Sequence, residues 1–346
     1  MVSQIEKRKI DHIKLCVEKD VAFKDKTTLL ECVELGYKTL PEISLDDVDL
    51  STEFLGKSFS FPLMVSAITG GAVVSKKINQ DIAKAAQELG IGMGLGSMRA
   101  MIESPSLADT YNVRDVAPDI FLAGNIGAAQ LTEYSPDLIN KSLLAVEADA
   151  LAIHLNAAQE AVQPEGDVDF SGVLTKIAEY VDEVNVPVYV KEVGHGISFE
   201  VAKALKDVGI KTIDVQGAGG TSWTMVDALR HKKGFGRTFR DWGIPTAVSV
   251  IETKNALGGE GTIVASGGIR NGIDAIKSIV LGADMVGIAM PVLKAQQKSY
   301  KTLNDYLHTF VNEMSVASFL LGCVNLEELS NEEYVVLGKL KDWLNQ

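Results

Sequence analysis

The sequence has few cysteines and no long apolar run, and each shortage excludes a class of protein. Three of its 346 residues are cysteine, and none forms a Cys-x-x-Cys pair or a spacing typical of zinc sites. Three reduced thiols in a cytosolic protein are the simplest interpretation. No apolar run reaches the roughly 18 residues that would span a bilayer, and the polar, charged start from Met1 to Asp11 is not typical of a signal peptide. We therefore expect a cytoplasmic protein.

Positive charge is also in short supply. Lysine and arginine number 33 against 46 aspartates and glutamates, so the net charge is −13 at pH 7. Because nucleic acids and anionic membranes attract basic surfaces, neither is expected as a partner. The chain also lacks a Walker-type phosphate loop and a cysteine–histidine cluster for a transition metal. None of this argues against a small anionic ligand, which needs only a local basic pocket.

Short apolar runs alternate with helical patterns from about Pro62 onward. Runs of this length and composition are typical of buried parallel strands. The expected strands are Leu63–Ala67, Gly90–Gly94, Ile120–Gly124, Ala150–His154, Val186–Val190, Thr212–Gln216, Thr262–Ser266 and Met285–Ile288. The segments between them have helix periodicity, for example Lys77–Leu89, Phe199–Val208 and Gly272–Leu281.

Eight strand–helix units in one chain predict a (β/α)8 TIM barrel. Glycines that could end the preceding helices stand before several strands, at Gly90, Gly209 and Gly282. The alternative is an open, doubly wound sheet. That fold normally follows its first strand with Gly-x-Gly-x-x-Gly, whereas this chain has Ile68-Thr69-Gly70-Gly71 there.

We expect one domain with additions at both ends of the barrel. Residues 1–60 do not fit the repeat and would form an extension that packs on the barrel and contributes to the substrate site. Residues 61–298 would form the barrel. Residues 299–346 show helical apolar spacing at Leu303, Leu307 and Val311, which predicts C-terminal helices.

The most informative stretch follows the strand expected at Ala150–His154. The side chains of His154, Asn156, Gln159 and Glu160 place an imidazole, two amides and a carboxylate within seven residues. Such groups cost stability when buried without partners, so packing alone does not explain them. Barrel enzymes hold their catalytic residues at the C-terminal ends of the strands. We interpret this stretch as the centre of an active site.

Two glycine turns follow the seventh and eighth expected strands. Ser266–Arg270 reads Ser-Gly-Gly-Ile-Arg, and Gly282–Met290 ends in Gly-Ile-Ala-Met. Loops in these two places often bind phosphate in barrels, because glycine lets backbone N–H groups approach the ligand. Ordinary tight turns are the alternative.

Polar or glycine-rich residues stand at other expected strand ends as well. Lys191 ends the fifth strand, where its ammonium needs an anion or a polar cofactor, and a flavin is one candidate. A salt bridge with Glu192 or another neighbour is the alternative. Ser97 and Asn125 follow the second and third strands, and the turn Gly217–Thr221 follows the sixth.

Basic residues could complete an anion site at this mouth. Arg8, Lys9 and His12 lie within little more than one helical turn, and Arg99 extends the Ser97 loop. If they converge, they suit a phosphate or diphosphate; singly they would be solvated surface charges. Mg²⁺ typically takes one or two carboxylates with phosphate oxygens, so the Glu160 carboxylate would suffice as its protein ligand. A carboxylate that stabilises a helix N-terminus is the alternative for Glu160.

These residues resemble the type 2 isopentenyl diphosphate isomerases, the flavin-dependent enzymes of isoprenoid synthesis. The resemblance covers nearly the whole chain. Its motifs are, in order, Arg8-Lys9-Ile10-Asp11-His12-Ile13, Thr69-Gly70-Gly71, Gly96-Ser97-Met98-Arg99, His154-Leu155-Asn156, Gln159-Glu160, Gln163-Pro164-Glu165-Gly166, Val190-Lys191-Glu192, Gly219-Gly220-Thr221-Ser222-Trp223, Asp241-Trp242-Gly243-Ile244-Pro245-Thr246 and Ser266-Gly267-Gly268-Ile269-Arg270. The chain departs from the family pattern at Ile68, where methionine is frequent, and at Gln216, where serine occurs.

The resemblance implies a barrel that binds FMN at its mouth and converts isopentenyl diphosphate to dimethylallyl diphosphate. It implies that the FMN is reduced, that Mg²⁺ is required, that a reductant such as NADPH is used, and that the protein forms tetramers or octamers. The FMN residues would be Ala67, Ile68, Thr69, Ser97, Asn125, Lys191, Thr221, Gly267, Gly268, Arg270, Ala289 and Met290. The substrate residues would be Arg8, Lys9, His12, Ser97, Met98, Arg99 and Gln159, with His154, Asn156 and Gln159 in catalysis and Glu160 on Mg²⁺.

The chemistry implied by the resemblance agrees with the residues present. Isomerisation adds a proton to an unactivated alkene and removes another from the adjacent carbon, which an ordinary carboxylic acid does poorly. A reduced flavin against the alkene can serve as acid and base, with Gln159 orienting the alkene. The alternatives are an FMN-dependent oxidase of 2-hydroxy acids and a non-catalytic sensor of a phosphate ligand. The oxidase would need a histidine base near the seventh strand, and the sensor would not need the His154–Glu160 cluster.

Overall fold

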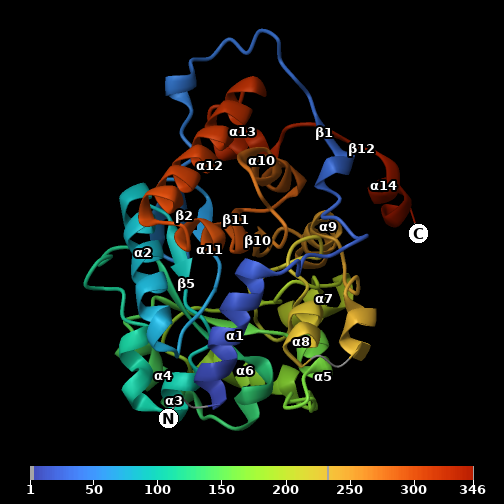
Figure 1. The fold of residues 1–346 in the computed structure, drawn as a ribbon. Coiled ribbons are helices and arrows are strands. Elements are labelled where there is room, and N and C mark those ends of the chain that lie inside the picture. Colours follow the sequence, from blue (N-terminus) through green and yellow to red (C-terminus); the bar gives the residue numbers. More distant parts are fainter. Residues whose placement is uncertain (1–3, 232–233, 346) are drawn as a thin grey trace.

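The computed structural model describes residues 4–231 and 234–345, and eight parallel strands at its centre close into a barrel (Figure 1). Each strand pairs with the next strand along the chain, and the last pairs with the first. The barrel strands are β4 (Leu63–Val65), β5 (Gly92–Gly94), β6 (Leu122–Gly127), β7 (Ala150–His154), β8 (Val188–Lys191), β9 (Thr212–Asp214), β10 (Thr262–Ser266) and β11 (Met285–Ile288). The predicted (β/α)8 barrel is confirmed, and the closed sheet excludes the open alternative.

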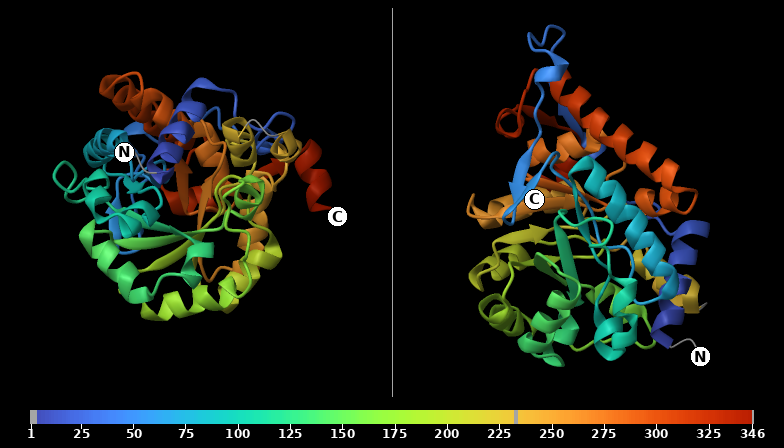
Figure 2. Two further views of the ribbon diagram at one scale, coloured as in Figure 1. Left: turned by 60° about the horizontal axis from the view of Figure 1, so that its bottom comes forward. Right: turned by 90° about the vertical axis from the view of Figure 1, so that its left-hand side faces the viewer.

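Helices surround the barrel on its outside, as Figure 2 shows. They are α2 (Val73–Leu89), α3 (Arg99–Glu103), α4 (Pro136–Ala145), α5 (Ala157–Val162), α6 (Val173–Glu183), α7 (Phe199–Asp207), α8 (Trp223–His231), α9 (Thr246–Leu257), α10 (Gly272–Leu281) and α11 (Met290–Gln296). Short 3₁₀ helices span Leu30–Cys32, Leu45–Asp47, Pro105–Thr110, Ala128–Thr132 and Gly234–Phe239. Helices α2 and α10 end at left-handed glycines, Gly90 and Gly282, as their positions in the sequence indicated.

The interior of the barrel changes from apolar to polar along the strands. Side chains alternate between the two faces of a strand, so residues two apart share the inner face. One buried inner layer holds the apolar residues Met64, Ala123, Ala152, Tyr189 and Val264. The next residues on the same face, towards the C-terminal ends of the strands, are Ser66, Asn125, His154, Lys191 and Ser266. This alternation places polar groups at the C-terminal mouth, where the predicted site lies.

An aromatic hairpin closes the opposite end of the barrel. Strands β2 (Thr52–Phe54) and β3 (Lys57–Phe59) pair antiparallel within the N-terminal extension. Phe54 and Phe59 are buried. Phe54 packs edge-on against Phe59, Phe121 and Tyr189, and Phe59 packs in a tilted arrangement against Phe121. The sequence predicted an extension that packs on the barrel but not this hairpin.

The rest of the extension and the tail lie along the barrel. Helix α1 (Gln4–Glu18) packs against α8 and α11 and crosses in front of the strands in Figure 1. Strand β1 (Val33–Leu35) of the extension pairs with β12 (Tyr334–Val336) of the tail. The remaining tail elements are α12 (Tyr300–Leu320), α13 (Leu326–Ser330) and α14 (Gly338–Leu344). No described helix combines the length and apolar character needed to cross a membrane.

Candidate active site

Two adjoining cavities open at the C-terminal ends of the strands. The larger measures about 380 Å³ and the smaller about 120 Å³. Lys9, His12, Ile68, Gln216 and Trp223 line both, so the two spaces meet beneath α1. Of the residues predicted to hold FMN, the larger cavity contains Ala67, Ile68, Thr69, Thr221, Gly267, Gly268, Arg270, Ala289 and Met290. The smaller contains Arg8, Lys9, His12, Ser97, Arg99, Asn125, His154, Asn156, Gln159, Glu160 and Lys191.

The larger cavity has a floor that only glycine can form. Gly267 and Gly268 have φ values of 92° and 77°, a region that side chains rarely adopt. A Cβ atom on Gly268 would lie 2.8 Å from the carbonyl carbon of Gly219, and one on Gly267 would lie 2.1 Å from the Gly217 oxygen. Arg270 stands at the end of this turn, where Nη2 donates to the Gly219 carbonyl at 3.3 Å. The floor therefore provides close backbone approach and a cation, as a phosphate group requires.

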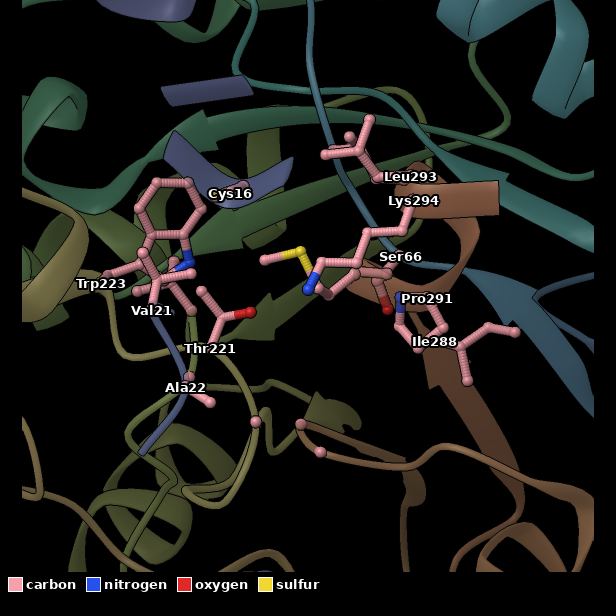
Figure 3. Close-up of a pocket in the computed structure, with 18 of the residues that line it drawn as sticks. Cys16, Val21, Ala22, Ser66, Thr221, Trp223, Ile288, Pro291, Leu293 and Lys294 are labelled. Atoms are coloured by element: carbon pink, nitrogen blue, oxygen red, sulfur yellow. The ribbon is translucent and has the colours of Figure 1, made fainter. Parts of the chain in front are cut away.

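The wall of the larger cavity comes from segments far apart in the sequence. Figure 3 shows Cys16 and Val21 on one side, Thr221 and Trp223 next to them, and Lys294 on the opposite side. Most of these walls are apolar. The Ser66 hydroxyl also lines this cavity, and it has no hydrogen-bond partner among the residues that the structure describes. A flat, largely apolar group with a phosphate and polar ring edges fits this cavity, which agrees with FMN.

His154 is held as a neutral imidazole at the bottom of the smaller cavity. The Asn125 amide nitrogen donates to the Leu95 carbonyl at 3.1 Å, so its oxygen accepts from His154 Nδ1 at 2.8 Å. Burial lowers the pKa of His154 well below its ordinary value, and the positive charges of Lys191 and Lys9 add to this lowering. Nε2 is therefore left as the acceptor of the ring.

Basic side chains gather on the upper side of the smaller cavity. Helix α1 contributes Arg8, Lys9 and His12, and Arg99 comes from the first residue of α3. Burial, together with the charges of Arg8 and Arg99, lowers the pKa of Lys9 to about 8. Mutual repulsion of this kind is relieved by a bound anion, so the cluster suits a multiply charged ligand. Arg99 also donates to the Asp167 carboxylate at 2.6 Å.

The carboxylate of Glu160 faces the smaller cavity from α5. One oxygen accepts from the Asn156 amide at 2.7 Å, and the other accepts from the backbone N–H of Asp167 at 2.9 Å. Burial raises its pKa, and these two hydrogen bonds oppose the rise. In the described part of the chain, no group of three or more His, Cys, Asp or Glu side chains could hold a metal ion. Glu160 fits Mg²⁺ only in the predicted form, with phosphate oxygens as further ligands.

Asp227 connects two of the predicted site residues, Gln159 and His12, but was not identified from the sequence. Its buried carboxylate on α8 accepts from Gln159 Nε2 at 3.0 Å, from His12 Nε2 at 3.1 Å and from Arg230 Nε at 3.0 Å. Burial raises the pKa of this carboxyl, but the His12 hydrogen bond and the Arg230 charge hold it below its usual value. Because the Gln159 amide nitrogen is engaged by Asp227, its oxygen remains for a ligand. Asp227 resembles a surface charge in the sequence, since it stands alone in the middle of a helix.

Met98 is the predicted substrate residue that the structure does not bring to either cavity. Its side chain is fully buried and packs behind the strands in the hydrophobic core, close to Gly124. Its backbone N–H donates to the Asn125 carbonyl at 2.7 Å. Met98 thus supports the loop that carries Ser97 and Arg99, and an apolar side chain in this position gains more from the core than from an anion site.

Comparisons with known proteins agree on the family. The model of the FMN-dependent dehydrogenase family matches residues 2–109 and 135–336. The isopentenyl-diphosphate delta-isomerase of Methanothermobacter thermautotrophicus is 45% identical over 344 residues, which cover 99% of this chain and 96% of that protein. The enzyme of the same name from Pyrococcus abyssi is 44% identical over 359 residues and covers 100% of this chain and 96% of that protein.

Solved structures extend the likeness to more distant flavin enzymes. A flavocytochrome b2 variant with pyruvate bound has a TM-score of 0.71 at 19% identity, covering 96% of this chain and 84% of that chain. A mandelate oxidase variant with an FMN adduct has a TM-score of 0.65 at 16% identity, covering 97% of this chain and 100% of that chain. At this identity the likeness shows the fold alone. The family match and the full-length relatives confirm the resemblance seen in the sequence: the chain belongs to the FMN-dependent dehydrogenase family and, within it, to the FMN-dependent isopentenyl-diphosphate delta-isomerases.

Proposed function

We propose that the protein interconverts isopentenyl diphosphate and dimethylallyl diphosphate with reduced FMN and Mg²⁺. The observation that carries this proposal is the junction of the two cavities beneath α1. A glycine-floored space suited to FMN opens directly into a smaller space lined by basic residues and one carboxylate. An alkenyl diphosphate needs both cavities, because its anionic head requires the basic residues and its reacting carbon atoms must reach the cofactor.

The charged head of the substrate would lie in the smaller cavity. Arg8, Lys9 and Arg99 supply positive charge and hydrogen-bond donors to the diphosphate, and His12 lines the same cavity. Glu160 would hold Mg²⁺ against the phosphate oxygens, and the Asn156 hydrogen bond keeps that carboxylate in place.

The hydrocarbon end of the substrate would lie where the cavities meet. Ile68, Val193 and Trp223 line both spaces and offer apolar surface to an isoprenyl group. Gln159 would present its amide oxygen there, since Asp227 holds its nitrogen. FMN in its reduced state supplies a group that can give a proton to one substrate carbon and take a proton from another.

The FMN itself would be held by groups of three kinds. The turn at Gly267 and Gly268, with Arg270, would take the phosphate. Ala67, Ile68, Thr69, Thr221, Ala289 and Met290 would line the remainder of its cavity, and Ser97, Asn125 and Lys191 would reach it from the smaller cavity. NADPH is the proposed reductant that brings the flavin to its active state.

A homo-oligomer, tetramer or octamer, is also part of the proposal. Tyr37, Ile273, Val316 and Leu320 border an apolar hollow of about 460 Å³ on the outer side of α10 and α12, and all four are exposed. Exposed apolar patches of this kind favour contact with another chain. Light scattering of the purified protein measures its mass, and a monomer would contradict this part.

The test is anaerobic incubation of the purified protein with isopentenyl diphosphate, FMN and Mg²⁺, with dithionite or NADPH as reductant. Dimethylallyl diphosphate is expected only in samples whose flavin is reduced and whose Mg²⁺ has not been chelated. A parallel sample with oxidised FMN and a 2-hydroxy acid examines the oxidase alternative. Bleaching of the flavin by the hydroxy acid, without isomerisation in the first sample, would contradict the isomerase.

A further inference from the structure

A buried carboxylate lies next to Lys191 in the polar layer of the barrel. We propose that Asp214 is a positioning residue that balances the charge of Lys191 and thereby sets the reduction potential and the protonation of the bound flavin. This inference rests on the FMN site proposed above. Asp214 lines neither cavity, so it would act through Lys191 and Gln216, which do.

The two charges are neighbours in the sheet. Lys191 and Asp214 are directly paired in the register of β8 and β9, and Asp214 is also paired with Val264 of β10, whose side chain lies inside the barrel. They are 4% and 1% exposed, so neither is solvated by bulk water. The ammonium of Lys191 donates to the Glu192 carbonyl at 2.5 Å. A buried cation of this kind needs an anion close by, and Asp214 is in the position to be that anion.

Both oxygens of Asp214 accept hydrogen bonds. The Ser266 hydroxyl donates to Oδ1, and the Gln216 amide nitrogen donates to Oδ2 at 3.1 Å. Gln216 has a φ of 37°, which a residue with a side chain adopts only at a cost. Because the Gln216 amide nitrogen donates to Asp214, the Gln216 amide oxygen is directed away from that carboxylate. Asp214 is therefore connected to both cavities through the side chain of Gln216.

Each member of the pair favours the charged form of the other. Burial raises the pKa of Asp214, and the charge of Lys191 and the Ser266 hydrogen bond oppose that rise. Burial also lowers the pKa of Lys191, and the charges of Asp214 and Glu192 oppose that fall. The other titratable groups around the pair are His154, held neutral, and Tyr189 beneath it, whose pKa burial and the Asp214 charge raise.

The net charge of the Lys191–Asp214 pair determines the electrostatic potential at a flavin in the adjoining cavity. A bare ammonium in a poorly solvated site favours an added negative charge, so it raises the reduction potential and favours the anionic form of reduced flavin. With Asp214 ionised, Lys191 acts mainly as an oriented hydrogen-bond donor. The neutral, protonated form of the reduced flavin is then less disfavoured. A flavin that acts by proton transfer, and not by hydride transfer, needs this form in order to donate a proton to the substrate.

The experiment compares the D214N holoenzyme with wild type by spectroelectrochemistry and by pH titration of the bound reduced flavin. We expect the ratio of reduced to oxidised flavin at a fixed potential to rise at least tenfold in D214N, which is about 30 mV for a two-electron couple. The ionisation of the reduced flavin should move to lower pH. D149N is the matched control, because Asp149 also accepts from a cation, Arg114 Nη2 at 2.8 Å, but at the opposite end of β7.

An unchanged or lower potential in D214N, or an equal shift in D149N, would overturn the inference. If D214N does not fold, K191M is compared with the K191M/D214N double variant, which leaves no uncompensated buried charge. At alkaline pH, where the Asp214 carboxyl is ionised in K191M, the double variant should have the higher potential, and equal potentials would overturn the inference. Failure of wild type to bind FMN would instead reject the proposed function.

Discussion

Lys9 is the residue whose charge state depends most directly on the arrangement of α1. It projects between the two cavities, and burial together with Arg8 and Arg99 lowers its pKa to about 8. Below this pH the ammonium is present to meet a diphosphate, and above it the cation is lost. The substrate site is therefore assembled with a pH-dependent charge that an isolated lysine would not have.

This predicts that kcat/KM for isopentenyl diphosphate falls above about pH 8, because kcat/KM reports ionisations of the free enzyme. In Lys9→Arg the fall should disappear, since a guanidinium remains protonated throughout this range. Lys7→Arg serves as the control, because Lys7 is exposed on the same helix. Identical pH profiles for wild type and Lys9→Arg would assign the fall to another group.

Residues of this site differ in how far the sequence reveals them. His154, Asn156, Gln159 and Glu160 could be found because four polar groups directly follow an apolar strand. Asp227 could not, because its partners Gln159 and His12 lie 68 and 215 residues away and only the fold brings them together. Asp214 was also missed, since it stands within an apolar run that reads as an ordinary buried strand.

At the scale of elements, the strands followed the apolar pattern closely. The structure confirms the predicted bounds of β7, β10 and β11, and the ends of β4, β5, β6 and β8 differ from the prediction by up to three residues. Strand β9 ends at Asp214 instead of Gln216. The reason is local, since Gln216 has a positive φ and leaves the extended conformation. The β2–β3 hairpin was not predicted, because its two three-residue strands are too short to show alternation and depend on burial against the barrel.

Because the hairpin lies far from the cavities, we predict that a substitution in it lowers the stability of the fold without changing kcat. Phe54 is 2% exposed and contacts three aromatic rings at the end of the barrel opposite to the cavities. Phe54→Ala should lower the free energy of unfolding by about 3–5 kcal/mol through the cavity it leaves, as measured by urea denaturation. The kcat of the folded variant should remain that of wild type.

Phe235→Ala is the matched control for this prediction. Phe235 is 57% exposed, so its loss should change the unfolding free energy by less than about 0.5 kcal/mol. A kcat that falls in Phe54→Ala under conditions where the protein is fully folded would show that the two ends of the barrel are coupled.

At the scale of the whole molecule, the FMN cavity joins segments that are distant in the chain. Residues from α1, from the ends of β4 and β9 and from α11 surround the same space. A ligand that binds only when these segments are together stabilises the complete fold. The stabilisation is about 2.7 kcal/mol when the ligand concentration is about 100 times its Kd.

For a chain of this length we expect FMN at that concentration to raise the Tm by about 4 °C, because unfolding entropy is about 2.1 cal/mol/K per residue. Differential scanning calorimetry with and without FMN measures the shift. Riboflavin, which lacks the phosphate, should give a much smaller shift at equal concentration, since the turn at Gly267 and Gly268 and the Arg270 guanidinium would have no anion to bind. Equal shifts with the two flavins would mean that this turn does not hold the phosphate, and the cofactor would have to lie elsewhere in the mouth of the barrel.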